Sequence, residues 1–366
     1  ISSFVRGDKN VIRISDLELN YNGLMFNRGL VLFEMNKGKL LATGAINQII
    51  NNSKASTSIT ALIKADNSFD LYSIDTLNTS QLEGVIKVSP VIWDDMKTFP
   101  QLDIVLKKDR SLLTARIDDG AILDSSYNME SGEITMAIKE LFPVRLTAGG
   151  SVRDSIVNME VENFYFDPGF INYFMPVDPF QQKRHVVFKG GNITGNLRIE
   201  GQVTDPDFYG VLNVNNIEVE TPYLSETPAP TSTTAYFDGD TINLDPLIIP
   251  LKRGEIEILS FFEFDGALPT TYNVDVNMSG SSGARVAYEI PYFSWDGHFI
   301  GSTHIEGSRK GGFLKGDLIC NDLYTSLESE AVMGPVKVVT KSPSINGFVV
   351  DLTIQTGRDV SFYLPN

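Results

Sequence analysis

The chain has 366 residues, of which 42% are hydrophobic and 21% are charged, and its formal net charge at pH 7 is −16. This balance is typical of a folded protein and argues against wholesale disorder. The negative charge disfavours nucleic acids and anionic lipid surfaces as electrostatic partners, because both attract clustered Lys and Arg.

An alternation of apolar and polar residues recurs along the chain and predicts β-strands. In each case one face of the strand is apolar and the other is polar, as in antiparallel sheets with one face turned away from water. The clearest segments are 16–21, 102–106, 157–162, 272–278, 350–354 and 360–364. The chain is therefore expected to be all-β.

Helical patterns are few. Residues 130–143 have apolar side chains at helical spacing, which predicts a short amphipathic helix. Residues 167–174 begin with an Asp N-cap and a Pro in the first turn, which predicts a single helical turn. Segment 40–64 fits either a helix or strands. We expect one to three short helices in all.

Two segments share one glycine pattern. Residues 195–210 read "GNLRIEGQVTDPDFYG" and residues 301–316, which start 106 positions later, read "GSTHIEGSRKGGFLKG". Gly inside a strand marks a bulge, a bend or a close approach of backbones, so the pattern predicts a strand-bend-strand unit used twice. The side chains able to do chemistry differ, because Asp205-Pro206-Asp207 aligns with Gly311-Gly312-Phe313. Shape is what the two copies share.

A Pro/Thr/Ser loop at 225–234 and a flexible turn at 279–283 bracket this repeat. We expect three parts: an N-terminal β-rich groove segment over 1–185, a first glycine-framed repeat over 186–283, and a second, truncated repeat over 284–366. The chain starts without Met and ends within a strand pattern, so a fragment of a longer protein is expected. The repeat alone fits either a continuous curved sheet or tandem sandwiches.

Reactive side chains form no recognisable site. The histidines at 185, 298 and 304 have no metal-ligand spacing with one another or with Cys320, and surface positions are expected for them. Asp-rich segments at 205–208, 237–240, 264–266 and 295–297 lack the ligand series of a calcium loop, and Asp-Gly favours hairpin turns.

Sequence motifs of catalysis are also missing. The chain has no G-x-S-x-G elbow, no P-loop and no dinucleotide fingerprint, and no carboxylate pair stands out for glycoside hydrolysis. It is therefore expected not to be an enzyme and to hold no metal or cofactor. No apolar run reaches the roughly 18 residues that suggest a membrane helix.

Three segments carry a resemblance to a known family. They are "FKGGNITGNLRIEGQVTDPDFYGVLNVNNIEVETP" (188–222), its echo "SWDGHFIGSTHIEGSRKGGFLKGDLICNDL" (294–323) and the terminal "DLTIQTGRDVSFYLPN" (351–366). They resemble the TamB translocation and assembly module family, part of the wider AsmA-like group of envelope proteins. The match is good over 186–224 and at the C-terminus, weaker over 284–325, and only general over 1–150.

The resemblance implies an elongated, curved, solenoid-like antiparallel sheet that forms an open apolar groove, a β-taco. It implies a periplasmic protein anchored to the inner membrane through a segment absent from this fragment, and an outer-membrane β-barrel partner of the TamA or BamA type. The expected function is a non-enzymatic scaffold or conduit for phospholipid acyl chains between the two membranes, for outer-membrane protein assembly, or for both.

Candidate groove residues follow from the alternation in the two repeats. They are Leu197, Ile199, Leu212, Val214, Ile217, Ile305, Leu318 and Leu323. The same residues equally fit a closed core. Two other functions stay open: a tandem β-sandwich adhesin or carbohydrate-binding protein, and a β-rich hydrolase.

Overall fold

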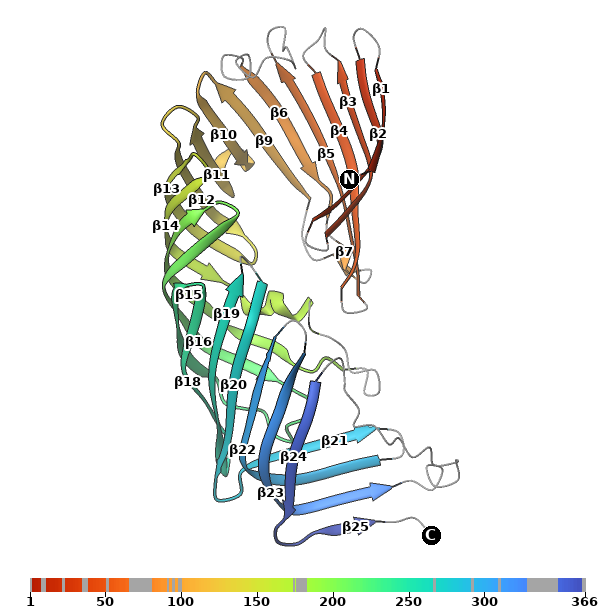
Figure 1. The fold of residues 1–366 in the computed structure, drawn as a ribbon, viewed down its shortest axis with the longest axis vertical. Helices are drawn as coiled ribbons and strands as arrows, with labels where there is room; N and C mark the ends of the chain where they lie inside the picture. The colour runs from red at the N-terminus through yellow and green to blue at the C-terminus, as the bar shows by residue number, and fades with distance from the viewer. Residues whose placement is uncertain are drawn as a thin grey trace. The chain divides into compact units, whose positions relative to one another are not determined.

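The computed structural model describes residues 2–7, 11–21, 24–34, 39–50, 53–65, 81–90, 92–93, 96–97, 101–173, 175, 183–265, 268–290, 293–308, 311–327 and 348–363. The chain divides into two units, Ile1–Phe164 and Tyr165–Asn366. Strands dominate both units (Figure 1), so the all-β prediction is confirmed.

Where it is described, the first unit consists of strands and one short 3-10 turn. Its elements are β1 (Ser2–Gly7), β2 (Val11–Tyr21), β3 (Leu24–Glu34), β4 (Lys39–Ile50), β5 (Ser53–Ala65), β6 (Leu82–Val88), β7 (Ile92–Trp93), β8 (Met96–Lys97), β9 (Leu102–Asp109), β10 (Leu112–Ile117), η2 (Asp118–Gly120), β11 (Leu123–Asn128), β12 (Glu133–Leu141), β13 (Val144–Arg153) and β14 (Ile156–Phe166).

Neighbouring strands of this unit pair antiparallel, mostly in chain order. The order runs β1-β2-β3-β4-β5-β6, then β9-β10-β11-β12-β13. The short strand β7 pairs with both β5 and β8. Short connections between consecutive strands favour this antiparallel arrangement. The result is a curved sheet that is not closed into a barrel.

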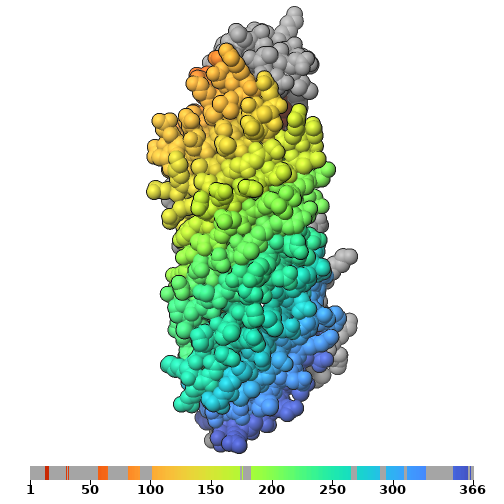
Figure 2. Space-filling model, turned by 90° about the vertical axis from the view of Figure 1, so that its left-hand side faces the viewer, coloured from red at the N-terminus to blue at the C-terminus, as the bar shows by residue number. Residues whose placement is uncertain are grey.

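The second unit is built the same way. Its elements are η3 (Pro168–Tyr173), β15 (Val187–Gln202), β16 (Asp205–Glu220), β17 (Thr231–Gly239), β18 (Thr241–Pro250), β19 (Gly254–Asp265), β20 (Leu268–Gly280), β21 (Ala284–Ile290), β22 (Phe293–Ser308), β23 (Gly311–Leu327), β24 (Phe348–Thr356) and β25 (Ser361–Tyr363). Antiparallel pairing runs from β15 to β20 and on through β22 to β23. In Figure 2 the colours of this unit follow one another across the visible surface from green to blue.

The last strands depart from the expected antiparallel pattern. Both β24 and β25 pair parallel with β23. Parallel neighbours need a long crossover connection, because the chain must return to the end at which the first strand began. Strand β23 ends at Leu327 and β24 begins at Phe348, and the segment between them lies outside the described residues.

The sequence repeat is also a structural repeat. Strands β15 and β22 begin and end at equivalent positions 106 residues apart, and each forms a long hairpin with the strand that follows. A Cβ added at Gly195 would lie 2.1 Å from the carbonyl oxygen of Val211, and one at Gly301 would lie 2.1 Å from that of Asp317. The close backbone approach predicted from the glycines is therefore present in both copies.

The helix predictions had mixed outcomes. The turn predicted at 167–174 is confirmed as η3, whereas the helix predicted at 130–143 is wrong, because this segment contains strand β12. Its apolar residues match a strand as well as a helix, and Ile134, Met136 and Ile138 alternate opposite β11. The ambiguous segment 40–64 lies within β4 and β5. None of the helices in the described part of the chain has the length and apolar character needed to cross a bilayer.

Candidate functional site

One face of the sheet in the second unit is apolar across successive strands. Residues directly opposite each other in a ladder share a face, and side chains alternate along each strand, so the register assigns the faces. We call this surface the apolar face; its central members are Ile193, Leu197, Ile199, Phe208, Leu212, Val214, Ala235, Phe237, Ile242, Leu244, Ile258, Phe262, Val274, Val276, Ile305, Leu314, Leu318 and Leu352.

The register places the candidate groove residues on this face. Six of the eight reach it by simple alternation: Leu197, Ile199, Leu212, Val214, Ile305 and Leu318. The other two, Ile217 and Leu323, reach it through a bulge. Asn216 has φ 48° and the equivalent Asp322 has φ 51°, and the register shifts at both places. The extra residue returns the next side chain to the apolar face.

One end of the apolar face is covered by the chain itself. Strand β21 pairs with the first half of β22, while β20 pairs with the second half, so β21 crosses the direction of β19 and β20 (Figure 1). Two closed clusters form there. The first contains Phe299, Leu318, Cys320 and Leu323, and the second contains Ile249, Ile256 and Ala284. Leu318 and Leu323 are thus core residues, at 8% and 9% exposure.

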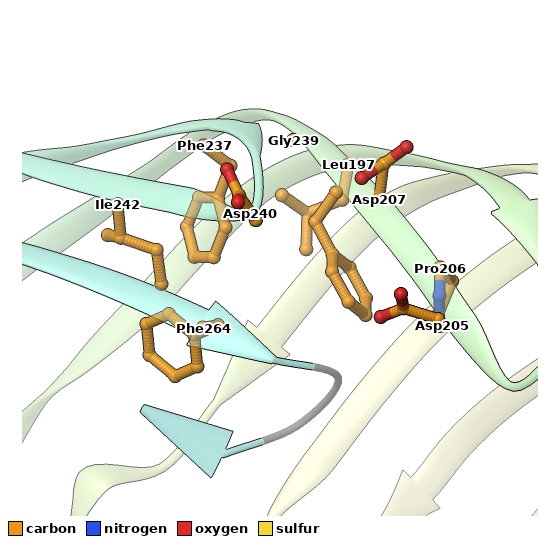
Figure 3. A pocket seen from close by; sticks show the side chains of 10 residues that line it. Leu197, Asp205, Pro206, Asp207, Phe237, Gly239, Asp240, Ile242 and Phe264 are labelled. Atoms are coloured by element: carbon orange, nitrogen blue, oxygen red, sulfur yellow. The ribbon is translucent and has the colours of Figure 1, made fainter. Parts of the chain in front are cut away.

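The hairpin ends of β15–β16 and β17–β18 carry a hollow that the chain leaves open. Its volume is about 470 Å³, within the usual range of small-molecule sites. Its wall contains Leu197, Phe208, Phe237, Ile242 and Phe264, all from the apolar face or its continuation. Asp205, Asp207 and Asp240 lie at its edge, and in Figure 3 the Asp207 carboxylate points away from the Phe237 and Phe264 rings. Apolar side chains left open to a hollow can bind an apolar ligand.

The opposite face of the second unit carries ion pairs, two between neighbouring strands and one, Arg198–Glu200, within β15. They include Lys189–Glu220 at 2.8 Å, Arg198–Glu200 at 3.1 Å and Arg285–Asp296 at 2.7 Å. The hydrogen bond from Lys189 lowers the pKa of Glu220. These groups are exposed, so each pair adds little stability, but together they keep this face wetted.

The first unit has an apolar face of the same kind. The register brings together Ile86, Leu106, Ala115, Ile104, Ile117, Leu123, Ile138, Met136, Leu146 and Ala148. Lys108 shares this face and is only 3% exposed. The polar face again carries ion pairs, Lys87–Asp103 at 3.1 Å and Arg116–Asp124 at 3.0 Å. A hydrogen bond from Gln101, then one from Lys87, lowers the pKa of Asp103.

The three histidines are each partly exposed. The His298 side chain is only 18% exposed and its Nδ1 lies 3.5 Å from Asp322, while His185 stacks on Tyr223. His304 is 34% exposed, with Nδ1 2.7 Å from Oδ1 of Asp275, and this hydrogen bond raises the pKa of His304. His185 and His298 are thus partly exposed, with Tyr223 from the turn after β16 stacked on His185 and Asp322 of the neighbouring strand β23 beside His298.

The single thiol is fully buried. Cys320 is 0% exposed, and desolvation raises its pKa to about 11. A thiol at that pKa is almost entirely protonated at neutral pH and is a poor nucleophile. In this environment Cys320 acts as an apolar core residue beside Phe299 and Leu318.

The prediction that the Asp-rich segments form hairpin turns holds for only part of them. Residues 237–240 include the turn between β17 and β18, as expected, whereas Phe264 and Asp265 lie in β19 and Gly266 lies outside the described residues. Residues 205–208 and 295–297 instead lie inside β16 and β22, so the turn prediction is wrong there. Within the part of the chain that the structure describes, no group of three or more His, Cys, Asp or Glu could hold a metal ion.

Comparisons with protein-family models, curated proteins and solved structures found no match to this chain. The proposals below therefore depend on the residues and on the fold.

Proposed function

We propose that this protein is a non-enzymatic envelope scaffold whose apolar β face guides phospholipid acyl chains between the inner and outer membranes, assists outer-membrane protein assembly, or does both. The observation that carries the proposal is the apolar face, which joins successive strands and remains open at the hairpin ends of β15–β16 and β17–β18. The sequence resemblance to the TamB family supports the same function.

The chemistry of the two faces fits an acyl-chain path. Covering the apolar surface that a half-buried apolar side chain exposes to water is favourable by about 25 cal/mol per Å². An alkyl chain can cover a row of such side chains without specific polar contacts. The charged side chains of the opposite face stay hydrated and keep the protein in solution.

Location and partners follow the family resemblance. In this proposal the protein works in the periplasm, is anchored to the inner membrane, and meets an outer-membrane β-barrel of the TamA or BamA type. The net charge of −16 is consistent with binding acyl chains instead of an anionic membrane surface.

Tandem sandwiches are less well supported. A sandwich module needs a second sheet packed face to face on the first. In the second unit, pairing continues from β15 to β23 within one sheet, and the glycine-framed hairpins are two parts of that sheet. The repeat thus extends the sheet instead of starting a new module.

The test places charge on the apolar face. The variant carries Ile199→Asp with Ile305→Asp, both half-buried on this face. Its matched control carries Val211→Asp with Ile319→Asp, which are 39% and 44% exposed and point to the opposite face of β16 and β23. Each protein is incubated with phospholipid vesicles, re-purified and analysed for bound lipid by mass spectrometry, with circular dichroism as the test of folding.

The proposal expects bound phospholipid in the wild type and in the control, and a large loss in the apolar-face variant. Equal lipid in a folded apolar-face variant and in its control would show that this face is not the path. A wild type that takes up no lipid but binds sugars would favour the carbohydrate-binding alternative.

A further inference from the structure

The open hollow has two chemically different parts. Leu197, Phe237, Ile242 and Phe264 provide an aliphatic and aromatic floor, and their side chains face one space in Figure 3. Exposed carboxylates of Asp205, Asp207 and Asp240 lie at the edge of the hollow, and the register puts Asp205 and Asp207 on the strand face away from Leu197. The site therefore suits a ligand that is apolar at one end and cationic at the other.

The carboxylates are not used by the protein's own cations. Among the described residues, none of the three forms an ion pair, and the basic side chain on the same strand end, Arg198, pairs with Glu200. A Cβ added at Gly201 or Gly239 would lie 3.5 Å or 3.7 Å from the Asp207 carboxylate, so both glycines leave space beside it.

This arrangement is confined to the first copy of the repeat. In the second copy Gly311-Gly312-Phe313 replace Asp205-Pro206-Asp207. The Tyr272 side chain lies against Gly307, where an added Cβ would come within 2.4 Å of its hydroxyl. The equivalent Gly201 has no such neighbour. Because both hairpins start their strands at equivalent residues and share their glycines, the fold itself does not require the acidic hollow.

We propose that the hollow is a subsite for an amphiphile whose headgroup carries an ammonium group, with its alkyl part on the aromatic floor. The inference rests on the proposed function and specifies the headgroup that this part of the path prefers. The carboxylates attract an ammonium and repel an anionic headgroup, and the faces of Phe237 and Phe264 attract a cation as well. An anionic lipid gains only the apolar contact.

The experiment compares two lipids with identical acyl chains. Wild-type protein is incubated with vesicles of equal parts phosphatidylethanolamine and phosphatidylglycerol, and the ratio of the two bound lipids is measured by mass spectrometry. The variant is Asp205→Asn with Asp240→Asn. The control, Asp238→Asn with Asp317→Asn, removes the same charge from exposed positions that do not line the hollow.

We expect phosphatidylethanolamine to be enriched on the wild type and on the control. We expect its ratio to phosphatidylglycerol to fall about fivefold in the variant, as for the loss of contacts between exposed opposite charges. An unchanged ratio with normal total lipid overturns this subsite but leaves the proposed function standing. A wild type that binds neither lipid overturns both.

Discussion

The bend of the repeat hairpins gives the sharpest stability prediction, through Gly301→Ala. Gly301 lies in β22 at φ 135°, a conformation that side chains rarely adopt. An added Cβ would lie 2.1 Å from the carbonyl oxygen of Asp317 and 3.1 Å from Cα of Leu318. The first distance is far below any real Cβ contact, and the atom it meets is backbone, which cannot rotate away.

The cost has two parts. Positive φ in a residue with a side chain costs about 1 kcal/mol or more, and forcing a methyl group into packed structure costs about 1–3 kcal/mol. The free energy of unfolding of the second unit should therefore fall by about 2–4 kcal/mol. For a unit of this size each kcal/mol lowers the melting temperature by about 2–4 °C, so a decrease of about 5–15 °C is expected.

Thermal and urea unfolding followed by circular dichroism measure this effect. Gly195→Ala, at the equivalent place in the first copy, should behave alike because its Cβ meets the Val211 carbonyl at the same 2.1 Å. The control is Gly149→Ala, whose added Cβ has nothing within 4 Å and which should be neutral or slightly stabilising. If Gly301→Ala unfolded at the same temperature and urea concentration as the wild type, the reasoning that close backbone approach sets the bend would be refuted.

Three further predictions concern single side chains. Leu318→Ala, inside the closed cluster, should lower the free energy of unfolding in urea by about 3 kcal/mol, whereas Leu197→Ala, beside the open hollow, should lower it by about 1 kcal/mol. Equal losses would mean that both ends of the apolar face are closed. The thiol of Cys320 should resist a thiol reagent at pH 8 and react fully in urea, since it is buried with a pKa of about 11; rapid labelling of native protein would contradict its burial. The bond to Asp275 raises the pKa of His304, so its stabilisation is complete below the unfolded pKa of about 6.5 and is lost as the pH rises through the folded pKa. After screening by solvent this stabilisation should be a few tenths of a kcal/mol. The free energy of unfolding, measured at pH 5 and pH 9, should show this pH-dependent part in the wild type and not in His304→Gln. If both proteins have the same pH profile, the bond contributes nothing to stability.

Much of the fold was predictable because alternation is a local property. Residues 272–278 and 157–162 show it directly, with apolar side chains more buried than their polar neighbours in β20 and β14. The same locality explains the error at 130–143. A short apolar pattern can satisfy both periods, and pairing with β11 and β13 decides for the strand.

The sequence predicted which face of the sheet the candidate residues lie on, but not how deeply each of them is buried. All eight groove residues lie on the apolar face, yet Ile217 and Leu323 do so only through bulges at Asn216 and Asp322. The aligned Asn215-Asn216 and Asn321-Asp322 could have indicated the bulge, because Asn and Asp tolerate positive φ better than most residues. The hollow was missed, since it combines side chains from several strands.

The sequence alone determined the strand faces, the repeat and the positions where backbones must approach closely, because each depends on side-chain period or on the absence of a Cβ. Only the tertiary structure decided which stretch of the apolar face is covered. Strand β21 closes one end over Leu318 and Leu323, while the hairpin ends beside Leu197 stay open. Burial depends on which distant strands pack together, and no local pattern in the chain encodes that choice.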